Sequence, residues 1–124
     1  MLIGRAPLTL EFDDATGSLV GITDRDSYRH LSAPEDGRLF RIVAPDDDVW
    51  IDRFADSHEC GQPEMRQDGD TLIIHFPHLR TQIGETLKIA VTARVSLPDG
   101  ADEARFTIEV VNNSPYRIHE VWYP

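Results

Sequence analysis

The ten residues KIAVTARVSL at positions 88–97 decide the fold. Apolar side chains occupy every second position of this stretch: Ile89, Val91, Ala93, Val95 and Leu97. Successive side chains of a strand point to opposite faces, so the alternation predicts a β-strand with one buried face and one wetter face. That arrangement is typical of antiparallel sheets, which pack one face on the core and leave the other in water.

A second strand with a matching pattern is predicted at Arg105–Asn112, after a turn region at Pro98–Ala104. Its polar residues are expected to face water and its alternate apolar residues to face the core. We therefore predict that these two strands supply the centre of one core. The six side chains of that centre are Val91, Ala93, Val95, Phe106, Ile108 and Val110.

Shorter stretches of the same period occur elsewhere in the chain. Leu8–Phe12 and Leu19–Thr23 flank the polar segment Asp13–Gly17 and predict a β-hairpin, in which Gly17 is free to take a positive φ. Residues 24–37 are polar and are expected to form a loop, and residues 56–67 are only weakly patterned. Further strands are expected at 38–43, 49–54, 71–76 and 117–123.

No long segment shows a helical period with capping residues. Short strands separated by Gly, Pro and Asp turns are typical of a sandwich or a barrel. We predict an all-β fold, an antiparallel β-sandwich of about eight to nine short strands. The length of 124 residues suits a single domain, residues 1–124.

The charge balance excludes some classes of partner. The formal net charge is −10, so neither nucleic acid nor an anionic membrane surface is an expected partner. Cys60 is the one cysteine, and no intrachain disulfide can form. The N-terminal residues lack the apolar core of a signal peptide, and no apolar run is long enough to span a membrane. A cytoplasmic location is therefore expected.

Ligand-type residues are present but poorly spaced for a metal. His58 and Cys60 form a His-x-Cys pair, and His75 and His78 form a His-x-x-His pair; neither is a zinc knuckle. Asp46–Asp48 and Asp52 could offer oxygen ligands to calcium, but their spacing does not match the EF-hand pattern. We expect no metal and no cofactor, and the sequence singles out no catalytic residue.

Aromatic residues are the remaining candidates for a binding site. Trp50, Trp122 and Tyr123 could stack on sugar rings, as could Tyr28, because aromatic rings offer a flat apolar surface with a polar tip. The alternative is that Trp50 and Trp122 fill the sandwich core or a domain interface.

Two segments resemble parts of a known family. Leu8–Phe12, Gly17 and Leu19–Asp24 resemble the first hairpin of the galactose-mutarotase-like β-sandwich. Phe106–Ser114 and Ile118–Pro124 resemble a later strand pair, in which an Asn-rich turn leads to a strand with a hydrophobic-Pro exit. The resemblance implies the N-terminal domain of a glycoside hydrolase, ahead of a catalytic barrel. It implies no catalytic residue in this chain, because the family's catalytic His and Glu motifs lie outside the matching segments.

Three functions follow as expectations. The first is a non-catalytic accessory domain, the N-terminal part of a longer carbohydrate-active enzyme, which packs against a downstream catalytic domain. The second is a stand-alone carbohydrate-binding module that uses Trp50 or Trp122. The third is a small epimerase-like or metal-dependent enzyme that uses His75 or His78. Because both faces of the strand at 117–123 carry apolar residues, we also expect a weak homodimer with Trp122 near the contact.

Overall fold

The computed structural model describes residues 1–46 and 52–123, and their regular structure is almost entirely β. Every strand pairing in this part of the chain is antiparallel. The predicted all-β class is therefore confirmed. The described residues form thirteen strands, because several edge segments contribute pieces of only two or three residues. No helix among them is long and apolar enough to cross a membrane.

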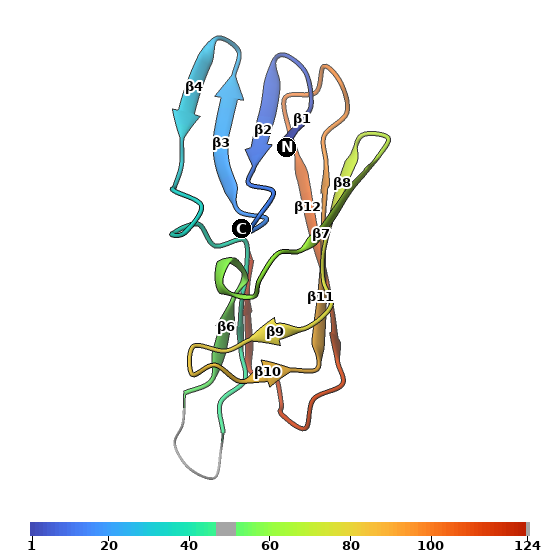
Figure 1. Cartoon of the computed structure of the whole chain (residues 1–124). Coiled ribbons are helices and arrows are strands. Elements are labelled where there is room, and N and C mark those ends of the chain that lie inside the picture. The colour runs from blue at the N-terminus through green and yellow to red at the C-terminus, as the bar shows by residue number, and fades with distance from the viewer. Residues whose placement is uncertain (47–51, 124) are drawn as a thin grey trace.

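The first sheet comes from the N-terminal third of the chain and is blue in Figure 1. In spatial order its strands are β1 (Leu2–Ile3), β2 (Leu8–Phe12), β3 (Leu19–Asp24) and β4 (Ser27–His30). The β2–β3 hairpin is confirmed. Gly17, with a φ of 74°, closes it, and a Cβ there would lie 3.0 Å from Ile74 of the second sheet. Only glycine fits both the backbone conformation and this close approach.

β4 corrects the loop predicted for residues 24–37. It pairs with β3 and all four of its residues are exposed. The Tyr28 hydroxyl donates a hydrogen bond to the Glu11 carboxylate, 3.0 Å away on β2. An edge strand without a buried face has no hydrophobic alternation, so the sequence carried no signal for it.

The second sheet contains the stretch that decides the fold. In spatial order its strands are β12 (Arg105–Asn112), β11 (Ile89–Ser96), β8 (Thr71–Phe76) and β7 (Glu64–Asp68). The strands predicted at 71–76, 88–97 and 105–112 are confirmed in position.

Three smaller strands form the third sheet, in the order β13 (Glu120–Trp122), β5 (Arg41–Val43) and β6 (Phe54–Asp56). A 3₁₀ turn, η1 (Ser57–Glu59), follows β6. The hairpin of β9 (Leu79–Arg80) and β10 (Thr86–Leu87) crosses the lower end of the sandwich in Figure 1. The second sheet makes one layer of the sandwich, and the first sheet with β6 below it lies on the opposite side (Figure 1).

The bounds of these small strands differ from the sequence-based expectation. The strand predicted at 38–43 is reduced to β5, because the backbone N–H groups of Leu39 and Phe40 donate to the Ser57 hydroxyl instead of to a strand. The strand predicted at 117–123 is reduced to β13. Of the strand predicted at 49–54, residues 49–51 lie outside the described part of the chain, and β6 begins at Phe54.

One core joins the three sheets. The residues of β11 that face it are fully buried, as predicted: Ile89, Val91, Ala93 and Val95. The alternate residues Leu72, Ile74 and Phe76 of β8 are at most 1 % exposed. The prediction for β12 needs correction. Phe106, Ile108 and Val110 lie opposite Val95, Ala93 and Val91 and share their face, but they are only partly buried. They border the core because β12 is the last strand of its sheet.

Candidate functional site

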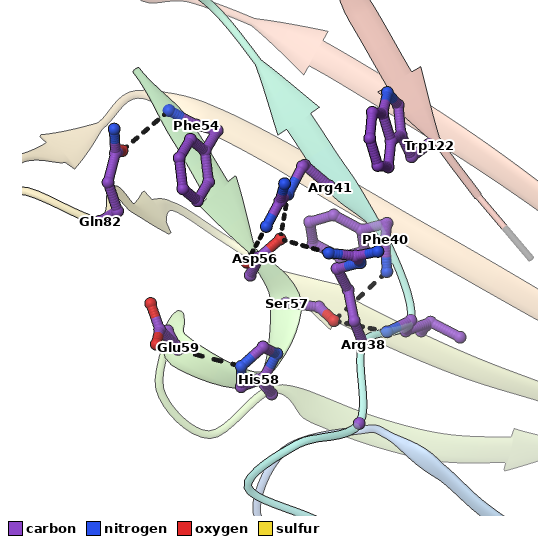
Figure 2. A network of polar contacts seen from close by, with 12 residues as sticks. Arg38, Phe40, Arg41, Phe54, Asp56, Ser57, His58, Glu59, Gln82 and Trp122 are labelled. Carbon is purple, nitrogen blue, oxygen red and sulfur yellow. Dashed lines mark hydrogen bonds and ion pairs between the residues drawn. The ribbon is translucent and has the colours of Figure 1, made fainter. Parts of the chain in front are cut away.

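The outer face of the third sheet carries a cluster of aromatic and charged side chains (Figure 2). Trp122 pairs with Arg41, and Arg41 pairs with Asp56. Directly paired residues project from the same face of an antiparallel sheet, so these three form one row across it. Glu120, Val43 and Phe54 form the neighbouring row in the same way.

Asp56 anchors this outer face. It is 7 % exposed, and its two carboxylate oxygens each accept a hydrogen bond of 2.7 Å from the Arg41 guanidinium. This hydrogen-bonded pair raises the pKa of Arg41, so its charge is permanent. The Arg41 guanidinium also lies 4.2 Å from the centre of the Phe54 ring, within the range of a cation–π contact. Arg41 is therefore held by contacts with both Asp56 and the Phe54 ring.

The η1 turn holds Asp56 in place. Ser57 is fully buried, and its hydroxyl accepts from the backbone N–H groups of Leu39 at 2.7 Å and Phe40 at 3.3 Å. His58 lies 4.0 Å from the Glu59 carboxylate through Nε2, and its buried Nδ1 has no hydrogen-bond partner among the described residues. The turn therefore ties the start of β5 to the end of β6.

Trp122 is 48 % exposed, and three charged side chains contact its ring. Its Nε1–H donates to the Glu120 carboxylate at 2.7 Å. The guanidinium groups of Arg41 and Arg38 lie 5.3 and 5.5 Å from the ring centre. Figure 2 shows both groups between the Trp122 ring and Asp56.

A hollow of about 180 Å³ adjoins this ring. It is lined by Arg38, Leu39, Phe40, Trp122 and Tyr123. Tyr123 closes one side: its hydroxyl donates to the Thr107 carbonyl at 2.8 Å, and its ring meets Phe106 edge-on at 6.3 Å. Burial raises the pKa of Tyr123 to about 12. The Tyr123 side chain that lines the hollow is therefore uncharged at ordinary pH.

Of the predicted aromatic candidates, the structure brings Trp122 and Tyr123 together at this hollow. Trp122 does not fill the core, which was one part of the alternative expectation; the other part, a place at a domain interface, stays a prediction. Trp50 lies outside the described residues. Tyr28 is 56 % exposed on β4, in a different sheet.

The residues suggested for metal or acid–base chemistry do not converge. The His75 Nδ1 is 2.9 Å from the Thr92 hydroxyl on the second sheet, and His78 is exposed beyond the end of β8. Asp46 lies 3.8 Å from Arg53, Asp52 is exposed, and Asp47 and Asp48 lie outside the described part. Within residues 1–46 and 52–123, no three His, Cys, Asp or Glu side chains are grouped to hold a metal.

Cys60 is buried, and this burial raises its pKa to about 11. Its Sγ donates to the Asp56 carbonyl at 3.2 Å and accepts from the Arg80 N–H at 3.4 Å. A protonated, enclosed thiol is a poor nucleophile. Cys60 therefore acts as a packing residue beneath the outer-face cluster.

Sequence reasoning missed Arg38, Arg41, Phe54 and Asp56. Their proximity depends on the register of two three-residue strands, and no local spacing encodes that register. No protein-family model matches the sequence, and no curated protein is significantly similar to it.

Proposed function

We propose that this chain is a non-catalytic β-sandwich domain of a carbohydrate-active enzyme, a glycoside hydrolase, and that it packs against the catalytic domain of the same protein. The proposed family is the galactose-mutarotase-like β-sandwich, which the segments at 8–24 and 106–124 resemble. A cytoplasmic location belongs to the same proposal.

The observation that carries the proposal is an open side of the sandwich between β12 and β13. Both are last strands of their sheets, and the described residues bridge them through Tyr123, the residue after β13, which contacts Phe106 and Thr107 of β12. Val121 shares the core-facing side of its sheet with its partner Ile42, yet Val121 is 42 % exposed and Ile42 only 1 %. Edge strands with exposed apolar side chains are surfaces on which another chain or domain packs.

The partly buried face of β12 points to the same conclusion. Phe106, Ile108 and Val110 are core-facing side chains that the described residues cover only in part. A partner domain seated along this side would complete their burial, and each partly covered apolar side chain would then add to docking free energy. The proposed docking surface is therefore Val121 with the core-facing edge of β12.

The test begins with the coding sequence on either side of this segment. A catalytic carbohydrate-active domain encoded there should bind this chain when the two are expressed as separate polypeptides and mixed in a calorimeter. Val121→Asp should weaken that binding by at least about tenfold, because it places a charge in an apolar contact. Ile83→Asp is the matched control, since Ile83 is 52 % exposed in the β9–β10 turn, away from this side.

An adjoining sequence without such a domain would contradict the proposal. So would a catalytic domain that binds both variants as tightly as it binds the unaltered chain.

A second candidate function, the carbohydrate-binding module, is favoured by one observation. Trp122 presents an exposed ring, hydrogen-bonded to Glu120, beside a hollow that Arg38 and Tyr123 also line. Trp122 lies on the outer face of the third sheet and Val121 on the core-facing side, so the two roles use different faces of β13.

A further inference from the structure

We propose that the hollow beside Trp122 binds an acidic sugar, a pyranose ring that carries a carboxylate, with Arg38 as the residue that recognises the carboxylate. This site goes beyond the docking role proposed above and is tested separately from it: Trp122 and Val121 lie on opposite faces of β13, and Tyr123 borders both surfaces.

Arg38 has hydrogen-bonding capacity that its neighbours leave unused. Arg41 already donates to both oxygens of Asp56, each at 2.7 Å. Arg38 reaches the same carboxylate only at 3.7 Å, and this ion pair and the Trp122 ring are its polar and aromatic contacts within the described residues. Its side chain is 37 % exposed. A guanidinium presents a planar fork of donors that matches a carboxylate, so Arg38 offers an open fork at the rim of the hollow.

The second element of the site is the exposed aromatic ring of Trp122. Trp122 is held through Nε1 by Glu120 at 2.7 Å and keeps an exposed surface. The flat C–H face of a pyranose suits such a surface, which is apolar and keeps a polar edge. The hydrogen bond to Glu120 favours one orientation of the ring, which reduces the side-chain freedom lost when a sugar stacks on it.

The two elements together define the ligand class. A neutral sugar would stack on Trp122 and offer Arg38 only hydroxyl oxygens, which are weaker acceptors than a carboxylate, and a small carboxylate would use Arg38 and leave the ring uncovered. The side chains of Leu39 and Phe40 are buried, so the accessible wall is formed by Arg38, Trp122 and Tyr123. A volume of about 180 Å³ suits one ring rather than a long chain of sugars. The two guanidinium groups here stand beside two carboxylates, those of Asp56 and Glu120, so the proposed recognition rests on directed hydrogen bonds from Arg38 rather than on a local excess of positive charge.

The experiment titrates the protein with methyl glycosides of glucuronic and galacturonic acid and follows the Trp122 indole N–H by NMR. The corresponding neutral methyl glycosides and acetate serve as probes of the two halves of the site. The Trp122→Phe variant assigns the indole signal. We expect a uronate to shift this signal and to bind at least about tenfold more tightly than either the neutral glycoside or acetate.

Arg38→Gln should reduce uronate affinity to that of the neutral glycoside, and Arg38→Lys should keep only part of the preference because it lacks the fork. Arg29→Gln removes an exposed arginine from β4 and should change nothing. A melting curve for each variant verifies that it is folded.

Three outcomes would overturn the inference. Equal binding of uronate and neutral glycoside would leave a plain sugar platform, and equal binding of uronate and acetate would leave an ion site. No binding of any sugar would remove both this site and the carbohydrate-binding candidate, while the docking proposal, tested with Val121→Asp, would stand.

Discussion

β11 and β12 are neighbours of equal length, paired residue by residue, with the same apolar alternation, yet they differ in burial. The core-facing residues of β11 are 0 % exposed. Their partners on β12 are only partly buried. The difference arises because β11 has a strand on each side whereas β12 is an edge. Alternation therefore identifies the face of a strand that meets the core, and position in the sheet decides how completely that face is covered.

The largest expected effect is a truncation on the closed strand. Ile89 of β11 is fully buried, so Ile89→Ala should lower the free energy of unfolding by about 2–5 kcal/mol, through lost burial and a cavity. Urea unfolding measures this loss. A loss as small as that of an exposed residue would show that β11 does not lie at the centre of the core.

The effect of intermediate size is the pH dependence of stability that the buried Cys60 thiol causes. Burial raises the pKa of Cys60 in the folded protein from 9.0 to about 11, so its contribution to stability is complete below about pH 9 and is lost as the pH rises towards 11. Between about pH 8 and pH 10, this group should cost about 1 kcal/mol of stability. Urea unfolding of the wild-type chain should therefore show a steeper fall over this range than that of Cys60→Ala. Parallel pH profiles would mean that the thiol is open to water.

The matched truncation on the edge strand should be milder. Ile108→Ala removes the same atoms as Ile89→Ala, but from a partly buried position on β12, and should cost about 1 kcal/mol. The same reasoning lowers the expected cost of Phe106→Ala below the roughly 3–5 kcal/mol of a fully buried phenylalanine. Equal losses of unfolding free energy for Ile89→Ala and Ile108→Ala would show that β12 is as well covered as β11.

The sequence predicts the parts of this fold in which burial imposes a pattern. β2, β3, β8, β11 and β12 could all be located because each has a core-facing side. β4 could not be located, since every one of its residues is exposed. The burial of Phe106 was overestimated for a related reason, because strand order within a sheet is not written into the alternation of any one strand.

The candidate site was predictable only as isolated aromatic residues. Trp122 and Tyr123 could be named from their chemistry, but Arg38, Arg41 and Asp56 join them only through tertiary pairing. The Ser57 hydroxyl, which bonds the start of β5, fixes that arrangement through contacts distant in sequence. Such a register cannot be derived from residue spacing.

The smallest expected effect, and the most direct test of the central claim, concerns the open side between β12 and β13. If that side is an interaction surface, the isolated chain should associate weakly with itself there, against the repulsion between two chains of net charge −10. Sedimentation velocity over an about hundredfold concentration range, at moderate and at high salt, measures this association. We predict a sedimentation coefficient that rises with concentration, rises more at high salt, and becomes constant in Val121→Asp but not in Ile83→Asp. A monomer at every concentration and salt, or equal association of the two variants, would contradict the claim that this side of the sandwich is built to be covered.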